Sequence, residues 1–316
     1  MPEHPGPKPR TEPLTTSILG ADGGTRKAQT LDDLLIELYC LLDDALPPQH
    51  LGRPRETGDA ELLCLAVAQM LLDCPRERAW LRRAGARLGH LFPRLPSREQ
   101  YNRRLRRLGP GLARALALLW ELHPDAASSF LLTDTTPVPA GTSIPTLHRS
   151  DLAGSAAVGY SSSHSRFYWG YKLILLTGPE GMPLGFDLVP ANTSDQTALR
   201  SILEHRSLGG RAILGDRGFR GTENDVAASG GTLLRPSFQS EKRRGRRTPA
   251  VLSRVRQWIE SINWTLKGQL SLERHGARTL DGLATRVGSR LLALAAALWF
   301  NALIGQPGRH LTAYDH

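Results

Sequence analysis

The spacing of apolar residues changes near position 129 and divides the chain into two parts. Before it, apolar residues recur at helical spacing, and we expect an all-helical region over 30–127. After it, short apolar runs bounded by Gly and Pro alternate with helical segments, and we expect an α/β domain over 128–306. Residues 1–29 are rich in Pro, Gly and Thr and are expected to be a disordered tail, with a second tail at 307–316. Helices in the first part are predicted at 31–46, 59–73, 97–107 and 111–122.

The second part predicts a mixed sheet with flanking helices. Three apolar strands come first, followed by strands that alternate with helices. This is the order of the ribonuclease-H-like fold, in which antiparallel strands are extended by parallel ones through helical crossovers. In that fold the first strand lies beside the fourth. The predicted strands are 129–138, 169–177, 183–189, 212–214 and 232–234, the helices 197–205, 222–229, 251–267 and 280–304, and a long loop spans 140–166.

Two aspartates stand where predicted strands end. Asp134 closes the first strand, and Asp216 follows the apolar run at 212–214, with Gly218 expected to let the backbone turn away. The topology places these two side by side, and Glu260 lies on a later helix, in a position to join them. Three adjacent carboxylates repel one another, and two divalent cations about 3.5–4 Å apart would remove that repulsion. Oxygen ligands of this kind suit Mg²⁺ or Mn²⁺.

Each acid also has a plain structural interpretation. Asp134 could cap the turn into the following prolines, and Glu260 could pair with Arg256 at helical spacing. Asp195 is typical of a helix cap, and Glu273 could take the place of Glu260. The three acids in this order favour the site over these alternatives.

Charge points to a polyanionic partner. The net charge is +10 and arginine dominates, which favours nucleic acid without deciding the fold. Near the acids, the candidate phosphate contacts are Lys172, Arg217, Arg220 and Lys267, and in the helical region they are Arg103, Arg104 and Arg107. Solvated surface cations, or arginine stems packed over leucines, are the alternative. The cluster 243–247 could contact phosphates or be a mobile loop.

The longest apolar run, 291–300, is too short to cross a membrane and is predicted to be a core helix. No membrane partner is therefore expected.

Six segments together resemble DDE transposases of bacterial insertion sequences. The resemblance covers about 31–306 and is clearest from residue 131. The segments are Asp134–Thr–Thr–Pro–Val, Trp169–Gly–Tyr–Lys–Leu, Val189–Pro–Ala–Asn–Thr–Ser–Asp–Gln, Leu214–Gly–Asp–Arg–Gly–Phe, Ile259–Glu–Ser–Ile–Asn–Trp–Thr–Leu–Lys and Arg274–His–Gly–Ala–Arg.

The resemblance implies a catalytic triad of Asp134, Asp216 and Glu260 that binds two Mg²⁺ or Mn²⁺ ions. It further implies cutting at terminal inverted repeats, which the N-terminal helices help to bind, and joining of the freed 3′-hydroxyl to target DNA. A homo-oligomer on DNA and a place in the bacterial cytoplasm, at the nucleoid, follow from the same resemblance. Two alternatives stay open: a metal-dependent nuclease of this fold without strand transfer, and an inactive DNA-binding remnant.

Overall fold

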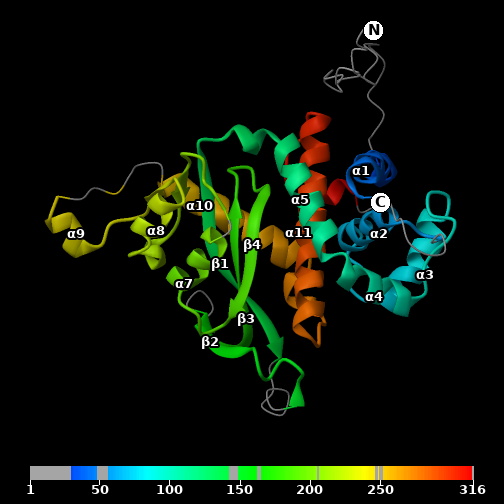
Figure 1. Cartoon of the computed structure of the whole chain (residues 1–316), viewed down its shortest axis with the longest axis horizontal. Coiled ribbons are helices and arrows are strands. Elements are labelled where there is room, and N and C mark those ends of the chain that lie inside the picture. The colour runs from blue at the N-terminus through cyan, green and yellow to red at the C-terminus, as the bar shows by residue number, and fades with distance from the viewer. Residues whose placement is uncertain are drawn as a thin grey trace, which may run out of the picture.

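The computed structural model describes residues 30–47, 56–141, 149–161, 165–204, 206–245, 248 and 252–314. A mixed sheet with its helices forms one side of the molecule, and a group of N-terminal helices forms the other (Figure 1). The predicted disordered tail at 1–29 lies outside the described residues.

The N-terminal region is helical, as the apolar spacing predicts. Its helices are α1 (Leu31–Ala45), α2 (Asp59–Leu71), α3 (Glu77–Leu88), α4 (Arg98–Arg107) and α5 (Gly109–Leu122). The side chain of Thr30 caps α1 and that of Ser97 caps α4, each accepting a backbone N–H of the first turn. Helix α2 is buried on nearly every side, so its apolar residues pack against several neighbours at once.

The sheet has the order β2-β3-β1-β5-β6, and β4 also pairs with β3. Strand β1 runs parallel to β5, so the prediction that the first strand lies beside the fourth predicted one is confirmed. The ribonuclease-H-like arrangement of antiparallel strands followed by parallel ones is present. The strands are β1 (Phe130–Gly141), β2 (Ala157–Ser161), β3 (Arg166–Thr177), β4 (Pro183–Pro190), β5 (Ala212–Leu214) and β6 (Thr232–Leu234).

Two predictions around β1 are wrong. Asp134 does not close the strand, which continues to Gly141, and Pro137 and Pro139 both stay in register with β3. Proline is tolerated here because β5 pairs with β1 only as far as Leu132, so the missing N–H costs no ladder hydrogen bond on that side. The predicted loop at 140–166 also contains strand β2, which pairs along the edge of β3.

Helices α7 (Asp195–Leu203), α8 (Glu223–Ala228), α9 (Gln239–Arg243) and α10 (Leu252–Trp264) accompany the sheet. The predicted α-helix through Lys267 ends earlier, because α10 passes into a π-helical turn at Thr265–Gln269. The predicted tail at 307–316 is not free over its described residues. Leu311 and Tyr314 are buried, and the Tyr314 hydroxyl donates to Asn301 Oδ1.

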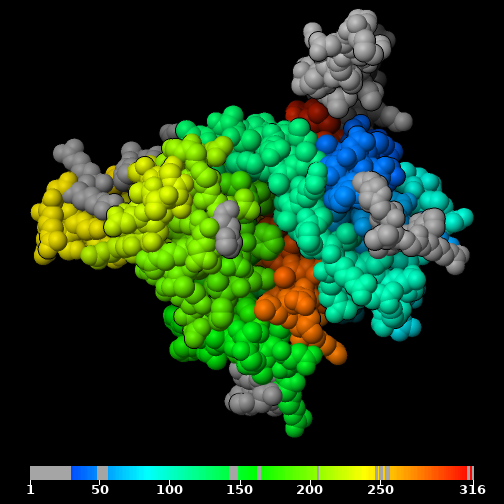
Figure 2. All heavy atoms as spheres, in the orientation of Figure 1, coloured from blue at the N-terminus to red at the C-terminus, as the bar shows by residue number. Residues whose placement is uncertain are grey.

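Helix α11 (Leu280–Leu303) is the central element of the molecule. It packs against α5 and β4 on the side of the sheet and against α2, α1 and α4 on the other. It is long and apolar enough to cross a membrane, yet 83% of its most apolar window is buried inside the protein, as expected of a core helix. In Figure 2 orange atoms of its N-terminal part are visible between the sheet part and the N-terminal helices, and red atoms from near the C-terminal end of the chain are visible at the top, while the chain between them is covered.

Candidate functional site

The register of β1 and β5 brings two predicted acids to the same place. The last pair of this parallel ladder joins Leu132 to Leu214. Asp134 follows Leu132 by two residues and is still in β1, opposite Leu175 of β3. Asp216 follows Leu214 by two residues and lies just beyond the end of β5. Parallel strands carry their carboxyl ends to one edge, and the two carboxylates therefore meet where β5 stops and β1 continues.

The environment of Asp134 disfavours its charged form. Burial is the largest cause that raises the pKa of Asp134 to about 7, and the negative charges of Asp216 and Asp195 raise it further. Hydrogen bonds from the Thr135 backbone N–H and the Asn263 amide act in the opposite direction. A carboxyl with this pKa is partly protonated near neutral pH, and a cation bound beside it would favour the carboxylate form, with the proton released to solvent.

Asp216 is held by the turn that follows it. Its side chain caps the short 3₁₀ helix Arg217–Phe219 by accepting the Gly218 N–H at 2.7 Å. The predicted reason for Gly218 is wrong, since this glycine is not among those with a positive φ. A Cβ at this position would instead lie 2.6 Å from Asp195 Oδ2 and 2.9 Å from Asp216 Oδ1. Glycine is needed here because two carboxylates approach its Cα.

Helix α10 supplies the next contact. Asn263 Nδ2 donates to Asp134 Oδ2 at 2.8 Å, which ties the helix to β1. A small hollow between them is lined by Asp134, Asn263, Ile259 and Ile262. Glu260 is exposed and stands three residues before Asn263, so the two share a face of α10. The side chain of Arg256, the alternative partner of Glu260, lies outside the described residues.

Asp195 is part of this site, and sequence reasoning assigned it only to a helix cap. The capping side chain of α7 is that of Ser194, which accepts the Thr197 N–H. The Asp195 carboxylate instead accepts from Lys172 Nζ at 2.9 Å and from Thr135 Oγ1 at 3.0 Å. Asn263 was missed as well, although its helical spacing from Glu260 was a usable signal.

The candidate phosphate contacts fall into two groups. Lys172 is engaged with Asp195, Lys267 lies 3.6 Å from Glu273, and Arg104 pairs with Asp59 at 2.6 Å. These three side chains have structural partners. By contrast, the four side chains that are exposed to solvent are those of Arg103, Arg107, Arg217 and Arg220.

The donor set at this edge suits a hard divalent cation. The charge of Asp216 lies close enough to Asp134 to raise its pKa, and a cation between the two carboxylates would relieve that repulsion. Within the part of the chain that the structure describes, no group of three His, Cys, Asp or Glu side chains is arranged to enclose an ion. Asp134 and Asp216 therefore form the fitted part of the site.

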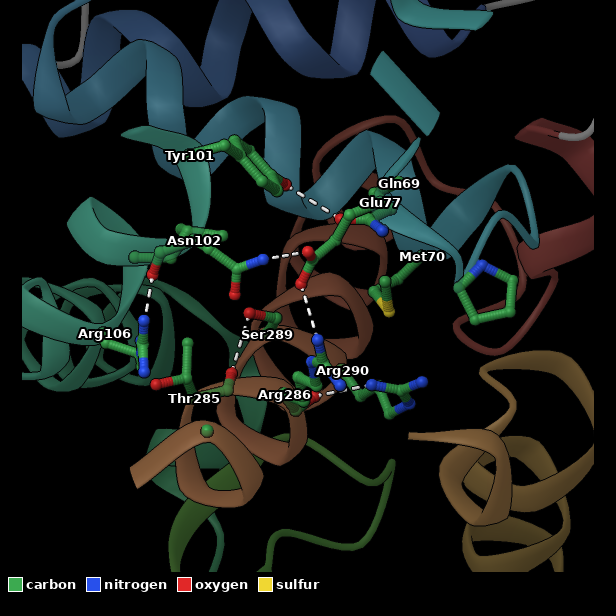
Figure 3. A pocket seen from close by; sticks show the side chains of 13 residues that line it. Gln69, Met70, Glu77, Tyr101, Asn102, Arg106, Thr285, Arg286, Ser289 and Arg290 are labelled. Atoms are coloured by element: carbon green, nitrogen blue, oxygen red, sulfur yellow. Dashed lines mark hydrogen bonds and ion pairs between the residues drawn. The ribbon is translucent and has the colours of Figure 1, made fainter. Parts of the chain in front are cut away.

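A second hollow lies between α2, α4 and α11 (Figure 3). Its polar side chains bind one another: Tyr101 donates to Gln69 at 2.9 Å, and Arg286 pairs with Glu77 at 2.7 Å. Asn102 also donates to Glu77. The Arg286–Glu77 pair joins α11 to the N-terminal helices, and the other two contacts join those helices to one another, so this hollow has a structural role.

A ribonuclease-H-like sheet with one acid in a strand and a second just beyond the end of the parallel strand beside it is typical of a class of nucleic-acid-processing proteins. The family model described as "Transposase DDE domain" matches residues 125–296, and the chain belongs to this family of DDE transposases. The match begins just before β1 and ends within α11. Searches of curated proteins and of solved structures give no match.

Proposed function

We propose that the protein is a DNA transposase that cuts the ends of its element and joins the freed 3′-hydroxyl to target DNA. Family membership supports a transposase or nuclease in general. The observation that carries the proposal further is the meeting of Asp134 and Asp216 at the edge of adjacent parallel strands. The negative charge of Asp216 adds to the effect of burial in raising the pKa of Asp134, which supports the closeness of the two carboxylates.

In this proposal Asp134, Asp216 and Glu260 hold two Mg²⁺ or Mn²⁺ ions. When bound, such ions would supply a nucleophilic oxygen and stabilise the leaving oxygen at phosphorus. Asn263 orients the Asp134 carboxylate, and the Gly218 N–H orients that of Asp216. Lys172 neutralises Asp195, so that this third aspartate adds less repulsion beside the pair.

DNA is the proposed partner on both sides of the reaction. Exposed arginines of α4, Arg103 and Arg107, are proposed to contact the terminal inverted repeats through phosphates. Arg217 and Arg220 are proposed to hold the strand beside the acids. A homo-oligomer on DNA, in the bacterial cytoplasm, is part of the same proposal, because two ends must be cut together.

A strand-transfer assay tests the proposal. The substrate is a duplex ending in the sequence that flanks the gene, with its 3′ end already cut, mixed with plasmid and Mg²⁺ or Mn²⁺. We expect joined products from the wild type and none from Asp216→Asn, with DNA binding retained. Arg114→Ala, at an exposed arginine of α5, is the control for loss of one surface charge.

A nuclease of the same fold is the alternative that this assay separates. Hydrolysis without joined products would reject the transposase in favour of the nuclease. Equal cleavage by the wild type and Asp216→Asn would reject the assigned site itself.

A further inference from the structure

Phe238 lies beside three arginines at the carboxyl end of the sheet. The guanidinium carbons of Arg217, Arg220 and Arg235 lie 5.8, 5.1 and 5.7 Å from the centre of its ring. Such distances are those of cation–π contacts. Arg217 and Arg220 come from the turn that begins at Asp216, so the ring connects this cluster directly to the candidate acids.

The three arginines differ in what neutralises them. Arg235 is buried, with Nη2 2.8 Å from Glu223 and 2.7 Å from Glu241. Arg217 and Arg220 are exposed, and neither forms an ion pair with any residue that the structure describes. Two exposed guanidinium groups beside one ring carry like charges, and an anion bound between them would reduce their repulsion.

The backbone that carries the ring is held by two hydrogen bonds. The Phe238 N–H donates to Glu241 Oε2 at 2.8 Å, and the preceding Ser237 N–H donates to Thr248 Oγ1 at 3.0 Å. Glu241 also binds the buried Arg235, so one carboxylate both holds the Phe238 backbone and pairs with Arg235. The ring is therefore attached to an anchored segment beside the two exposed arginines.

We propose that Arg217, Arg220 and Phe238 form a phosphate clamp beside Asp216, in which Phe238 is a positioning residue that orients both guanidinium groups. A guanidinium that contacts an aromatic ring through its face keeps its N–H edge available for bidentate bonds to a phosphate. Helix α9 begins directly after Phe238 and exposes Lys242, Arg243 and Arg244. The clamp thus starts a basic track that leads a DNA strand from Asp216 toward α9, at the edge of the molecule away from the N-terminal helices (Figure 1).

This inference rests on the proposed function for its ligand, a DNA phosphate, and its test is separate. Full-length wild type, Phe238→Leu and Phe238→Tyr are titrated with a short fluorescent DNA duplex over a range of salt concentrations. We expect Phe238→Leu to bind roughly three- to tenfold more weakly, since two cation–π contacts are lost, and Phe238→Tyr to bind as the wild type does. The salt slope should fall by about 0.7–0.9 for each phosphate contact that is lost.

A cycle with the arginines distinguishes positioning from simple packing. In the Arg217→Ala/Arg220→Ala background, Phe238→Leu should cause no further loss of binding, because the residues it positions are gone. Additive effects, or equal binding by Phe238→Leu and Phe238→Tyr, would overturn the clamp. If Phe238→Leu fails to fold, Arg217→Lys/Arg220→Lys takes its place: lysine keeps the charge but not the planar stacking, and wild-type affinity would then reject the clamp.

Cleavage of the same duplex with Mn²⁺ keeps the two proposals apart. A failed binding series together with inactive Asp216→Asn would reject only the clamp. Asp216→Asn that cleaves as the wild type does would reject the proposed acidic site, while the binding series would still decide the clamp.

Discussion

Asn263 and Asp134, 129 residues apart in the chain, are joined by a hydrogen bond of 2.8 Å from the amide of helix α10 to the carboxylate of strand β1. This bond fixes the helix that carries Glu260 over the strand that carries Asp134. The donor is a neutral amide, so this bond orients the carboxylate without adding a positive charge beside it.

Replacing Asn263 by Asp should make the fold depend on a divalent cation. The change removes a donor and places a second carboxylate against Asp134, and we expect a loss of about 1–3 kcal/mol in unfolding free energy without metal. Added Mg²⁺ or Mn²⁺ should restore part of this stability, as measured by thermal unfolding with EDTA and with metal. Asn263→Ala is the control, since it loses the bond without adding charge. A variant that melts as the wild type does in EDTA would contradict the expected repulsion.

Asp134 should make the metal-free protein less stable as pH rises. Its folded pKa of about 7 lies above the usual value of 3.8, so the protonated carboxyl favours the fold. This contribution is complete below about pH 4 and is lost as pH rises toward 7. At pH 8 we expect Asp134→Asn to exceed the wild type by about 1–3 kcal/mol, with the partial exposure of the carboxyl reducing the effect.

Denaturant unfolding in EDTA at pH 4 and pH 8 measures this difference. The comparison between the two proteins matters because burial lowers the pKa of His123 to about 4 and raises that of Asp125 to about 6, and both groups titrate in the same range. Their contributions cancel between wild type and Asp134→Asn. A gap between the two proteins that does not change with pH would show that Asp134 is not the titrating group.

Gly218→Ala should impair activity more than stability. The added Cβ would push against the carboxylates of both Asp195 and Asp216, which lie at 2.6 and 2.9 Å from its position. Displacement of a catalytic group by about 1 Å can cost roughly 100-fold in rate. Metal-dependent DNA cleavage and thermal unfolding are measured together. Gly109→Ala is the matched control, because nothing lies within 4 Å of its Cβ position. Cleavage by Gly218→Ala at the wild-type rate would show that the close approach has no role in catalysis.

Arg235→Met should loosen the segment around α9. The buried guanidinium pairs with both Glu223 and Glu241, and its removal takes this partner from each carboxylate, at a cost of roughly 3–5 kcal/mol that the partial exposure of Glu223 reduces. Hydrogen exchange of the amides of Phe238 and its neighbours should become faster. Arg235→Met combined with Glu223→Gln and Glu241→Gln should recover most of the protection, since the two negative charges that faced the guanidinium are then removed. Unchanged exchange in the single variant would contradict this role of Arg235.

More of the sheet than of the candidate site could be predicted from the sequence. Apolar runs at 212–214 and 232–234 gave the parallel strands, and chain order alone placed β1 beside β5. Strand β2 was missed because its five residues include Gly and Ser and resemble the surrounding loop, while the partner that makes them a strand, β3, is specified elsewhere. The prolines of β1 led to a wrong prediction of where the strand ends for a related reason. A proline lacks an N–H, and whether this costs a hydrogen bond of the sheet depends on where β5 stops.

At the site, Asp134 and Asp216 could be paired from topology, but their neighbours could not. The role of Asp195 arises from the way α7 approaches Gly218, which no local pattern encodes. The π-helical turn after Trp264 changes the face on which Lys267 points, and the sequence there reads as an ordinary helix. The assignment of Glu260 as the third acid stays a prediction.

Helix α11 is covered on both faces, and this bears on the proposed handling of DNA. The arginine-bearing α4 and strand β4, which belongs to the same sheet as the acids, both pack against this helix, so neither can move away without exposing its leucines to water. If α4 holds an element's end as proposed, the distance between that contact and the acids is set by side-chain packing rather than by a flexible linker.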